Sequence, residues 1–207
     1  TYKIFWKLHD HIPDEELRLI DLTLRMFCDP VLRIDIPRVQ AELEAEIGGK
    51  AAALLRSGAS IETLMSNDKF AELLKREGVN PPMKTSPSTG KPTYAFAKSD
   101  LDFQQLLRHP NKNVVALAEA RLKVKSTIGE TRAARFLEAG KNGMKLPILL
   151  NYSGAHTHLW SGGNKMNLQN LKRGGELRRS ILAPKGHVIV VADSAQIEAR
   201  VLAWLAQ

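Results

Sequence analysis

An isolated carboxylate, Asp193, stands where sheet-containing enzymes often place a chemically active group. The residues before it, Val188 to Ala192, form an apolar, mostly β-branched run that predicts a short strand buried on both faces. After it, Ile197, Val201 and Leu205 recur every four residues, which predicts a helix. A carboxylate between a core strand and a helix can meet a ligand, or it can cap the helix, since Asp is a favoured N-cap. The spacing fits both interpretations.

Basic side chains gather on an earlier segment, a predicted helix over residues 113–137. Five of them share its polar side: Arg121, Lys123, Lys125, Arg132 and Arg135. The helix follows residues 79–98, which hold four prolines and three lysines and which we predict to be an open basic loop. A basic loop next to a basic helical face favours contact with nucleic acid, although solvated linkers and helix faces have the same composition.

Residues 153–170 are rich in Gly, His, Asn and Ser, which is typical of a loop that presents specific side chains. His156 and His158 are two residues apart, so they would lie on one side of an extended segment. We do not expect a zinc site here, because the pair lacks a convincing third ligand. A further basic cluster lies between this loop and the strand before Asp193: Lys172, Arg173, Arg178 and Arg179.

Composition limits the functional class. The 207 residues carry 30 Lys and Arg against 22 Asp and Glu, a net charge of +8, which favours a polyanionic partner. One cysteine, Cys28, excludes an intrachain disulfide and a multi-cysteine zinc site within this chain, and a reducing, cytoplasmic setting is the simplest expectation. No apolar run approaches the roughly 20 residues of a membrane span, so we expect no membrane partner. The chain starts at Thr1 and stops at Gln207 within a helical pattern, so we expect a piece of a longer protein.

These residues must be positioned by a mostly helical α+β fold. Periodicity and end signals predict helices and short strands in alternation. The expected helices span 14–29, 37–47, 51–55, 61–64, 68–77 (with Gly78 as C-cap), a segment after Asp100, 113–137 and the residues after Asp193, and the expected strands span 31–35, 147–152 and 187–193.

Five elements follow one another along this chain: the loop at 84–91, Lys123 to Thr127, Asn167 to Asn170, Arg178 to Pro184 and Asp193 to Arg200. Together they resemble the family A DNA polymerases, and Gly154-Ala-His-Thr157 is most like the polymerases of bacteriophages. Asp193-Ser-Ala-Gln-Ile-Glu-Ala-Arg200 resembles motif A of that family, Asp-Tyr-Ser-Gln-Ile-Glu-Leu-Arg. Arg178 to Pro184 is similar to its Arg-x-Ala-Phe-x-Ala-Pro lead-in, and Asn167 to Asn170 matches its Asn-Leu-Gln-Asn element. Lys123-Val-Lys-Ser-Thr127 resembles the Lys-Leu-Lys-Ser-Thr of the thumb helix, and the loop at 84–91 is similar to the one before that helix.

The resemblance implies roles at the polymerase centre. Asp193 and the backbone carbonyl of Ser194 would bind Mg²⁺ in a two-metal nucleotidyl-transfer site, where hard oxygen ligands are required. Gln196 and Arg178 would approach the triphosphate of the incoming deoxynucleotide, for which a guanidinium is well suited. Glu198 would lie beneath the incoming sugar and exclude a 2′-hydroxyl.

The resemblance also implies contacts with primer–template DNA. The thumb helix would hold the duplex backbone through Lys123, Lys125, Ser126 and Thr127, and the later element would line the primer–template through Asn167, Gln169 and Asn170. Phosphate contacts position a duplex without reading its sequence, which suits an enzyme that copies any template. The implied domains are the end of an upstream exonuclease-like domain with a connecting helix (1–30), a thumb (31–145) and a partial palm (146–207), in the cytoplasm of a bacterial host if phage-encoded.

Three departures from the family pattern matter. Thr157-His-Leu159 stands where the family has Thr-Gly-Arg, so Leu159 cannot make the minor-groove contact of that arginine. Ser194-Ala195 replaces Tyr-Ser, a mild change because the metal contact is through the backbone. The fingers helix and the second catalytic Asp are absent, so we expect the chain to be inactive alone. The alternatives are a non-catalytic nucleic-acid-binding module and a basic helical structural protein.

Overall fold

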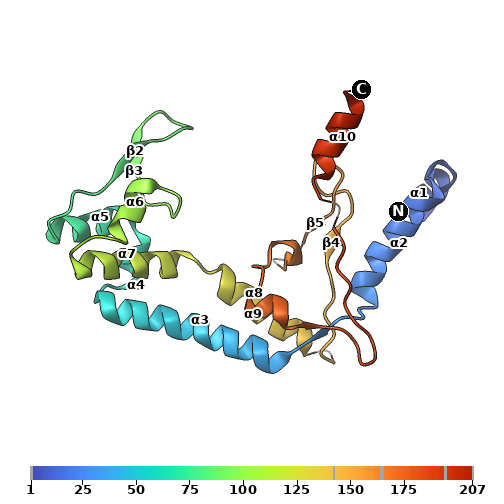
Figure 1. Ribbon diagram of the computed structural model, residues 1–207, viewed down its shortest axis with the longest axis horizontal. Helices are drawn as coiled ribbons and strands as arrows, with labels where there is room; N and C mark the ends of the chain where they lie inside the picture. Colours follow the sequence, from blue (N-terminus) through green and yellow to red (C-terminus); the bar gives the residue numbers. More distant parts are fainter. Residues whose placement is uncertain (1, 142, 164–165, 194, 207) are drawn as a thin grey trace.

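The computed structural model describes residues 2–141, 143–163, 166–193 and 195–206 (Figure 1). The fold is α+β and 55% helical with a few small antiparallel strand pairs, which agrees with the predicted class. Its α-helices are α1 (Tyr2–Leu8), α2 (Asp14–Cys28), α3 (Ile36–Ser57), α4 (Ile61–Met65), α5 (Asn67–Arg76), α6 (Leu101–Leu106), α7 (Lys112–Lys125), α8 (Ile128–Gly140), α9 (Glu176–Arg179) and α10 (Ile197–Leu205). Two 3-10 helices also occur, η1 (His9–His11) and η2 (Leu168–Asn170).

The strands of the described residues form three separate antiparallel pairs instead of one continuous sheet. They are β1 (Arg33–Ile34) with β6 (Ile181–Leu182), β2 (Met83–Thr85) with β3 (Pro92–Tyr94), and β4 (Leu150–Asn151) with β5 (Ser161–Gly162). The pair β2–β3 lies within residues 79–98, so the prediction of an open loop there is wrong in part. The predicted strand at 147–152 is confirmed only at its end, as β4.

The longest helix, α3, packs against both α7 and α8 along the base of the view in Figure 1. At its start Asp35 accepts a hydrogen bond from the backbone N–H of Arg38 (3.2 Å), and Gly58 ends it in a left-handed conformation with φ 61°. The prediction of two separate helices, 37–47 and 51–55, is wrong, because α3 continues through Gly48 and Gly49 between them. Each glycine costs about 1 kcal/mol relative to alanine in a helix interior, and tertiary packing outweighs that cost.

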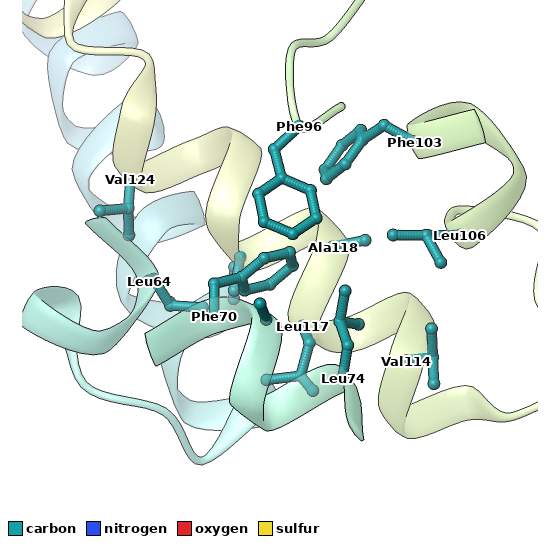
Figure 2. Close-up of a cluster of buried hydrophobic side chains, with 13 residues drawn as sticks. Leu64, Phe70, Leu74, Phe96, Phe103, Leu106, Val114, Leu117, Ala118 and Val124 are labelled. Carbon is teal, nitrogen blue, oxygen red and sulfur yellow. The ribbon is translucent and has the colours of Figure 1, made fainter. Parts of the chain in front are cut away.

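The first hydrophobic core joins α3, α4, α5, α6 and α7 with the segment that follows β3 (Figure 2). Phe70, Phe96 and Phe103 form its centre, and the Phe70 and Phe96 rings meet edge to face with centroids 5.0 Å apart. Aliphatic residues from the same helices fill the remaining volume: Ala53, Leu64, Ala71, Leu74, Leu106, Val114, Leu117, Ala118, Ala120 and Val124. The hairpin β2–β3 is attached to this core through Phe96, which follows β3.

A second core lies at the other end of α3. Val39 of α3 and Phe136 of α8 are fully buried there beside Ile34 of β1 and Leu146. Met166, Leu171 and Leu177 add the segment that leads to α9. The pair β1–β6 closes this core, with Ile34 opposite Ile181.

The predicted helix over 113–137 is two helices, α7 and α8, that meet at Ser126 and Thr127. Ser126 is extended (φ −96°, ψ 100°) and follows the last residue of α7, and its N–H still bonds to the Leu122 carbonyl (3.1 Å). A hydroxyl residue competes with the helical backbone and favours helix ends. The sequence pattern therefore indicated helix on both sides of Ser126 and Thr127 but not the break between α7 and α8.

The two ends of the chain are the least packed parts of the fold. At the amino end, Pro13 precedes α2, whose first turn holds Asp14, Glu15 and Glu16, which confirms the predicted helix start. At the carboxyl end, the predicted buried strand over 187–193 is wrong, because these residues form no strand and Val188 and Val190 are each 83% exposed. Among the described residues, no helix is long and apolar enough to cross a membrane.

Candidate nucleic-acid interface

The basic groove is a hollow of about 950 Å³ between the hairpin β2–β3, α3 and the carboxyl half of α7. Six basic and two acidic side chains line it, together with two aromatic rings from β3 and the segment behind it. Its lining is Glu46, Ala53, Arg56, Asn67, Lys84, Tyr94, Phe96, Ala97, Lys98, Glu119, Arg121, Leu122, Lys123, Lys125, Ser126 and Ile128. A hollow of this size with an excess of cations is suited to an anionic ligand.

Arg121 is part of the wall of this groove and not of a solvated helix face, which corrects the sequence prediction. Its side chain is only 2% exposed. The guanidinium donates to the carbonyls of Leu64 (2.6 Å) and Ser66 (3.2 Å) and to Oδ1 of Asn67 (2.5 Å). Burial lowers the pKa of Arg121 to about 10, so the group remains charged at neutral pH.

Aromatic rings cover the same guanidinium. Its central carbon lies 4.4 Å from the Phe70 ring centroid and 4.8 Å from that of Phe96, within the range of cation–π attraction. The Phe96 ring stacks on Tyr94 with centroids 5.0 Å apart and an interplanar angle of 3°. Arg121 therefore ties α7 to α4, to α5 and to the segment after β3, and it fixes the shape of the groove.

Lys123, Lys125 and Ser126 lie at one edge of the groove, at the end of α7, and all three are exposed. Thr127 is also exposed and sits at the start of α8. Burial, and then the charge of Arg121, lower the pKa of Lys125. Among the described residues, neither Lys123 nor Lys125 has an acidic side chain within ion-pair distance. Both predicted thumb-helix cations thus line the groove.

Two other cations of the groove, Arg56 and Lys84, are already paired with acidic neighbours. Arg56 contacts Glu119 (3.2 Å), and Lys84 donates to both carboxylate oxygens of Asp100 (2.7 and 2.9 Å). Asp100 also accepts the backbone N–H of Ala97 (2.7 Å), which locks the start of α6 to the hairpin. Hydrogen bonds from Lys84 and then from Ala97 hold the pKa of Asp100 below its usual value. These pairs anchor the groove walls.

The predicted primer–template residues Asn167, Gln169 and Asn170 lie around η2, beside the second core. The Asn167 side chain accepts the Gln169 N–H (3.0 Å) and caps the turn, and the Gln169 side chain donates to the carbonyl of Trp160 (3.1 Å). Arg132 of α8 donates to the Asn170 carbonyl (3.1 Å). Gln169 and Asn170 remain exposed, but these contacts give the segment a structural role as well.

The predicted catalytic and nucleotide-binding residues lie on separate elements, because α9, which holds Arg178, is well apart from α10, which holds Glu198 (Figure 1). Asp193 and Glu198 are exposed, Arg178 is exposed on α9, and Ser194 lies outside the described residues. Gln196, at φ 53°, occupies the N-cap position of α10 without a side-chain cap bond, so the interpretation of Asp193 as the cap is wrong. Among the described residues, no group of three His, Cys, Asp or Glu side chains is placed to hold a metal ion, and this includes His156 and His158.

The Thr157-His158-Leu159 sequence has an unusual backbone. His158 adopts a left-handed conformation with φ 59°, which glycine takes more easily than any other residue, and Leu159 is 58% exposed. Nδ1 of His158 lies 2.8 Å from Oγ of Ser153, itself left-handed with φ 50°. This hydrogen bond offsets part of the strain and holds the loop between β4 and β5.

Sequence reasoning missed three lining residues, Lys84, Tyr94 and Lys98, as members of a site. The available signal was the spacing Tyr94-x-Phe96, which places two rings on one side of an extended segment between lysines. The assumption of an open loop concealed it. No family model, curated protein or solved structure matches this chain.

Proposed function

We propose that this chain is part of a DNA-templated DNA polymerase of the family A type, and that its basic groove edge holds the backbone of primer–template DNA. Two independent features support this proposal. The first is the ordered series of motif resemblances from the thumb-like Lys123–Thr127 to the segment at Asp193–Arg200. The second is physical: Lys123 and Lys125 are exposed, adjacent in space to Ser126, and free of ion-pair partners among the described residues.

The exposed lysine pair carries the proposal. A lysine that is already neutralised offers little to a phosphate, whereas an exposed one releases counterions when it binds DNA. The pair stands on a helix whose other face is fully buried through Val114, Ala118 and Arg121. Its position is therefore fixed by packing, as a duplex-holding surface requires.

In the complete polymerase, Asp193 would supply one oxygen ligand to Mg²⁺, and Gln196, Glu198 and Arg178 would face the deoxynucleotide. Among the described residues, no group of three His, Cys, Asp or Glu side chains converges around Asp193, whereas a Mg²⁺ site needs several converging oxygen ligands. Nucleotidyl transfer belongs to the proposal for the whole enzyme.

A non-catalytic nucleic-acid-binding module is the second candidate, and one observation favours it. The basic groove is built completely within the described residues, whereas the segment around Asp193 is exposed and unpacked. A binding module needs the basic groove, and it does not need an ordered segment around Asp193. The retained series Asp193, Gln196, Glu198 and Arg200 favours the polymerase.

The test is primer–template binding by the whole chain, followed by fluorescence anisotropy over a series of salt concentrations. We expect affinity to fall steeply with salt, and the double variant Lys123→Ala/Lys125→Ala to lower the logarithmic salt slope by about two. The matched control removes two exposed lysines outside the groove, Lys75→Ala/Lys112→Ala, and should leave most of the slope intact. Asp193→Ala should bind as the unaltered chain does.

Equal slopes for the two double variants would contradict the assignment of the groove edge as the DNA-holding surface. Binding without any salt dependence would contradict a phosphate-based contact altogether. To separate the two candidates, the chain can be joined to the remainder of a family A palm and fingers and assayed for primer extension. Extension that is abolished by Asp193→Ala supports the polymerase, and no extension from a folded hybrid supports the module.

A further inference from the structure

The basic groove contains more than a phosphate-binding edge. A duplex held only by its backbone needs cations on an accessible surface, and Lys123 and Lys125 provide them. The groove also extends inward to Tyr94 and Phe96, rings that a backbone contact does not require. This aromatic wall is the feature that the proposed function leaves unexplained.

The aromatic wall is rigid. Tyr94 stacks parallel on Phe96 (5.0 Å, 3°), and Phe96 is 8% exposed. Behind Phe96 lies the Arg121 guanidinium, which is fixed by hydrogen bonds to α4 and to Asn67. Stacked π systems that already have their orientation set lose little conformational freedom when another ring is added.

Tyr94 is the outer member of this stack. It lines the groove and is only partly buried, so its ring is reachable from the groove. The backbone of β3 holds it in place through pairing with Met83 of β2. A flat ligand that enters the groove therefore meets an aromatic surface with a defined orientation.

Cations surround this surface. Lys98 and Lys125 line the same groove, and among the described residues neither has an acidic side chain within ion-pair distance. The carboxylate of Glu119, one of the two acids of the lining, is occupied by Arg56 (3.2 Å). An aromatic platform with unneutralised lysines around it is the arrangement that binds unpaired nucleotides, through base stacking and phosphate contacts.

We propose that the basic groove binds an unpaired nucleotide, with its base stacked on Tyr94 and its phosphate held by the lysines of the groove. The volume of about 950 Å³ is within the range of about 300–1,000 Å³ that is usual for small-ligand sites. The nucleotide belongs either to a single-stranded stretch of DNA or to a free mononucleotide. The inference extends the proposed function, because it adds a base-binding site to a surface proposed to hold only backbone, but it does not depend on polymerase activity.

The experiment compares three labelled or competing ligands on the full chain at fixed salt: dT12, an abasic 12-mer with the same number of phosphates, and dTMP as a competitor. We expect dT12 to bind roughly tenfold more tightly than the abasic strand, because stacking contributes only when bases are present. Tyr94→Leu, which keeps an apolar side chain against Phe96, should remove that preference, and Tyr94→Phe should keep it. Circular dichroism melting checks that each variant folds.

Displacement of dT12 by millimolar dTMP indicates a site for a free nucleotide, and displacement only by longer strands indicates a site for single-stranded DNA; either result supports the inference. Equal affinity of the unaltered chain for dT12 and the abasic strand would overturn it, whether or not the leucine variant folds. Retention of the preference in folded Tyr94→Leu would overturn it as well. Binding to a blunt-ended duplex by Lys123→Ala/Lys125→Ala tests the proposed function separately, because a blunt duplex contains no unpaired base.

Discussion

The basic groove and the C-terminal segment, residues 185–206, both carry residues that the sequence marks as functional, yet only the groove is packed. Behind the groove wall, Phe70, Phe103 and Ala118 are fully buried. In the C-terminal segment Val190 is 83% exposed and Trp204 is 71% exposed. The groove is built from helices that pack against neighbouring elements of the chain. A buried strand, as predicted for 188–192, needs packing partners on both sides, and the described residues provide none.

A motif in the sequence does not by itself form a packed site in the structure. Lys123 and Lys125 have fixed positions because α7 is anchored by its buried face. The residues around Asp193 match a sequence motif, but no packing fixes the orientation of their side chains. Because the two regions differ in packing, substitutions in them are expected to lower the free energy of unfolding by different amounts.

The largest effect is expected for Phe70→Ala, which removes the ring that contacts both Phe96 and Arg121. A fully buried Phe replaced by Ala costs about 3–5 kcal/mol, because transfer free energy is lost and a cavity is left. Urea unfolding followed by circular dichroism measures the change. A loss below about 1 kcal/mol would mean that the core behind the groove is not the main source of stability.

Arg121→Met should cost about 2–3 kcal/mol. The substitution leaves the carbonyls of Leu64 and Ser66 without their buried donor, although it also removes the desolvation cost of a charge. Arg121→Lys retains the charge but not the planar fork, and should recover less than half of the loss. The same urea titration applies, and a methionine variant as stable as the unaltered chain would show that desolvation cancels the hydrogen bonds.

Asp100→Asn should cost about 1–2 kcal/mol at neutral pH, because it weakens the link to Lys84 and Ala97. Since those partners lower the folded pKa of Asp100, its stabilisation is complete above the unfolded pKa of about 3.9 and is lost as the pH falls through the lower folded value. Thermal melts from pH 7 to pH 2 should therefore show the two proteins converging at acidic pH. A constant difference over that range would exclude the ionised carboxylate as the cause.

The smallest effect is expected for Val190→Ala in the C-terminal segment. An exposed side chain without packing partners contributes less than about 0.5 kcal/mol, so the urea midpoint should stay unchanged. The same valine-to-alanine change at Val114, which is fully buried in the first core, is the matched control and should cost more than 1 kcal/mol. Equal losses at the two sites would remove the distinction between the regions.

The sequence predicted the helical elements well where amphipathic spacing agreed with end signals. The start of α2 after Pro13 and the end of α5 before Gly78 follow from local chemistry, and so does the strand at Arg33–Ile34. The errors arose where tertiary contacts determine which secondary structure a segment adopts. Packing against α7 and α8 carries α3 through Gly48-Gly49, and pairing of Met83 with Tyr94 orders a stretch that its composition marks as loop.

The site was predictable in part for the same reason. The cations at Lys123 and Lys125 could be found from charge and spacing, but the burial of Arg121 could not, because it depends on carbonyls at Leu64 and Ser66 more than fifty residues away. Tyr94 was missed because its role comes from stacking on Phe96 in a segment that was predicted to be an open loop. The exposure of Val188–Val191 contradicts a pattern that predicts a core strand, since burial requires partners as well as apolar side chains.

The helix α3 contributes Ala53 to one core and Val39 to the other. Neither half of this helix can unwind without exposing apolar surface, and unwinding of one half removes the hydrogen-bonded support at the end of the other. The two cores are therefore expected to melt as one cooperative unit, although they share no central sheet. The glycine pair between the halves, with open space around Gly48, is the point at which that cooperativity is weakest.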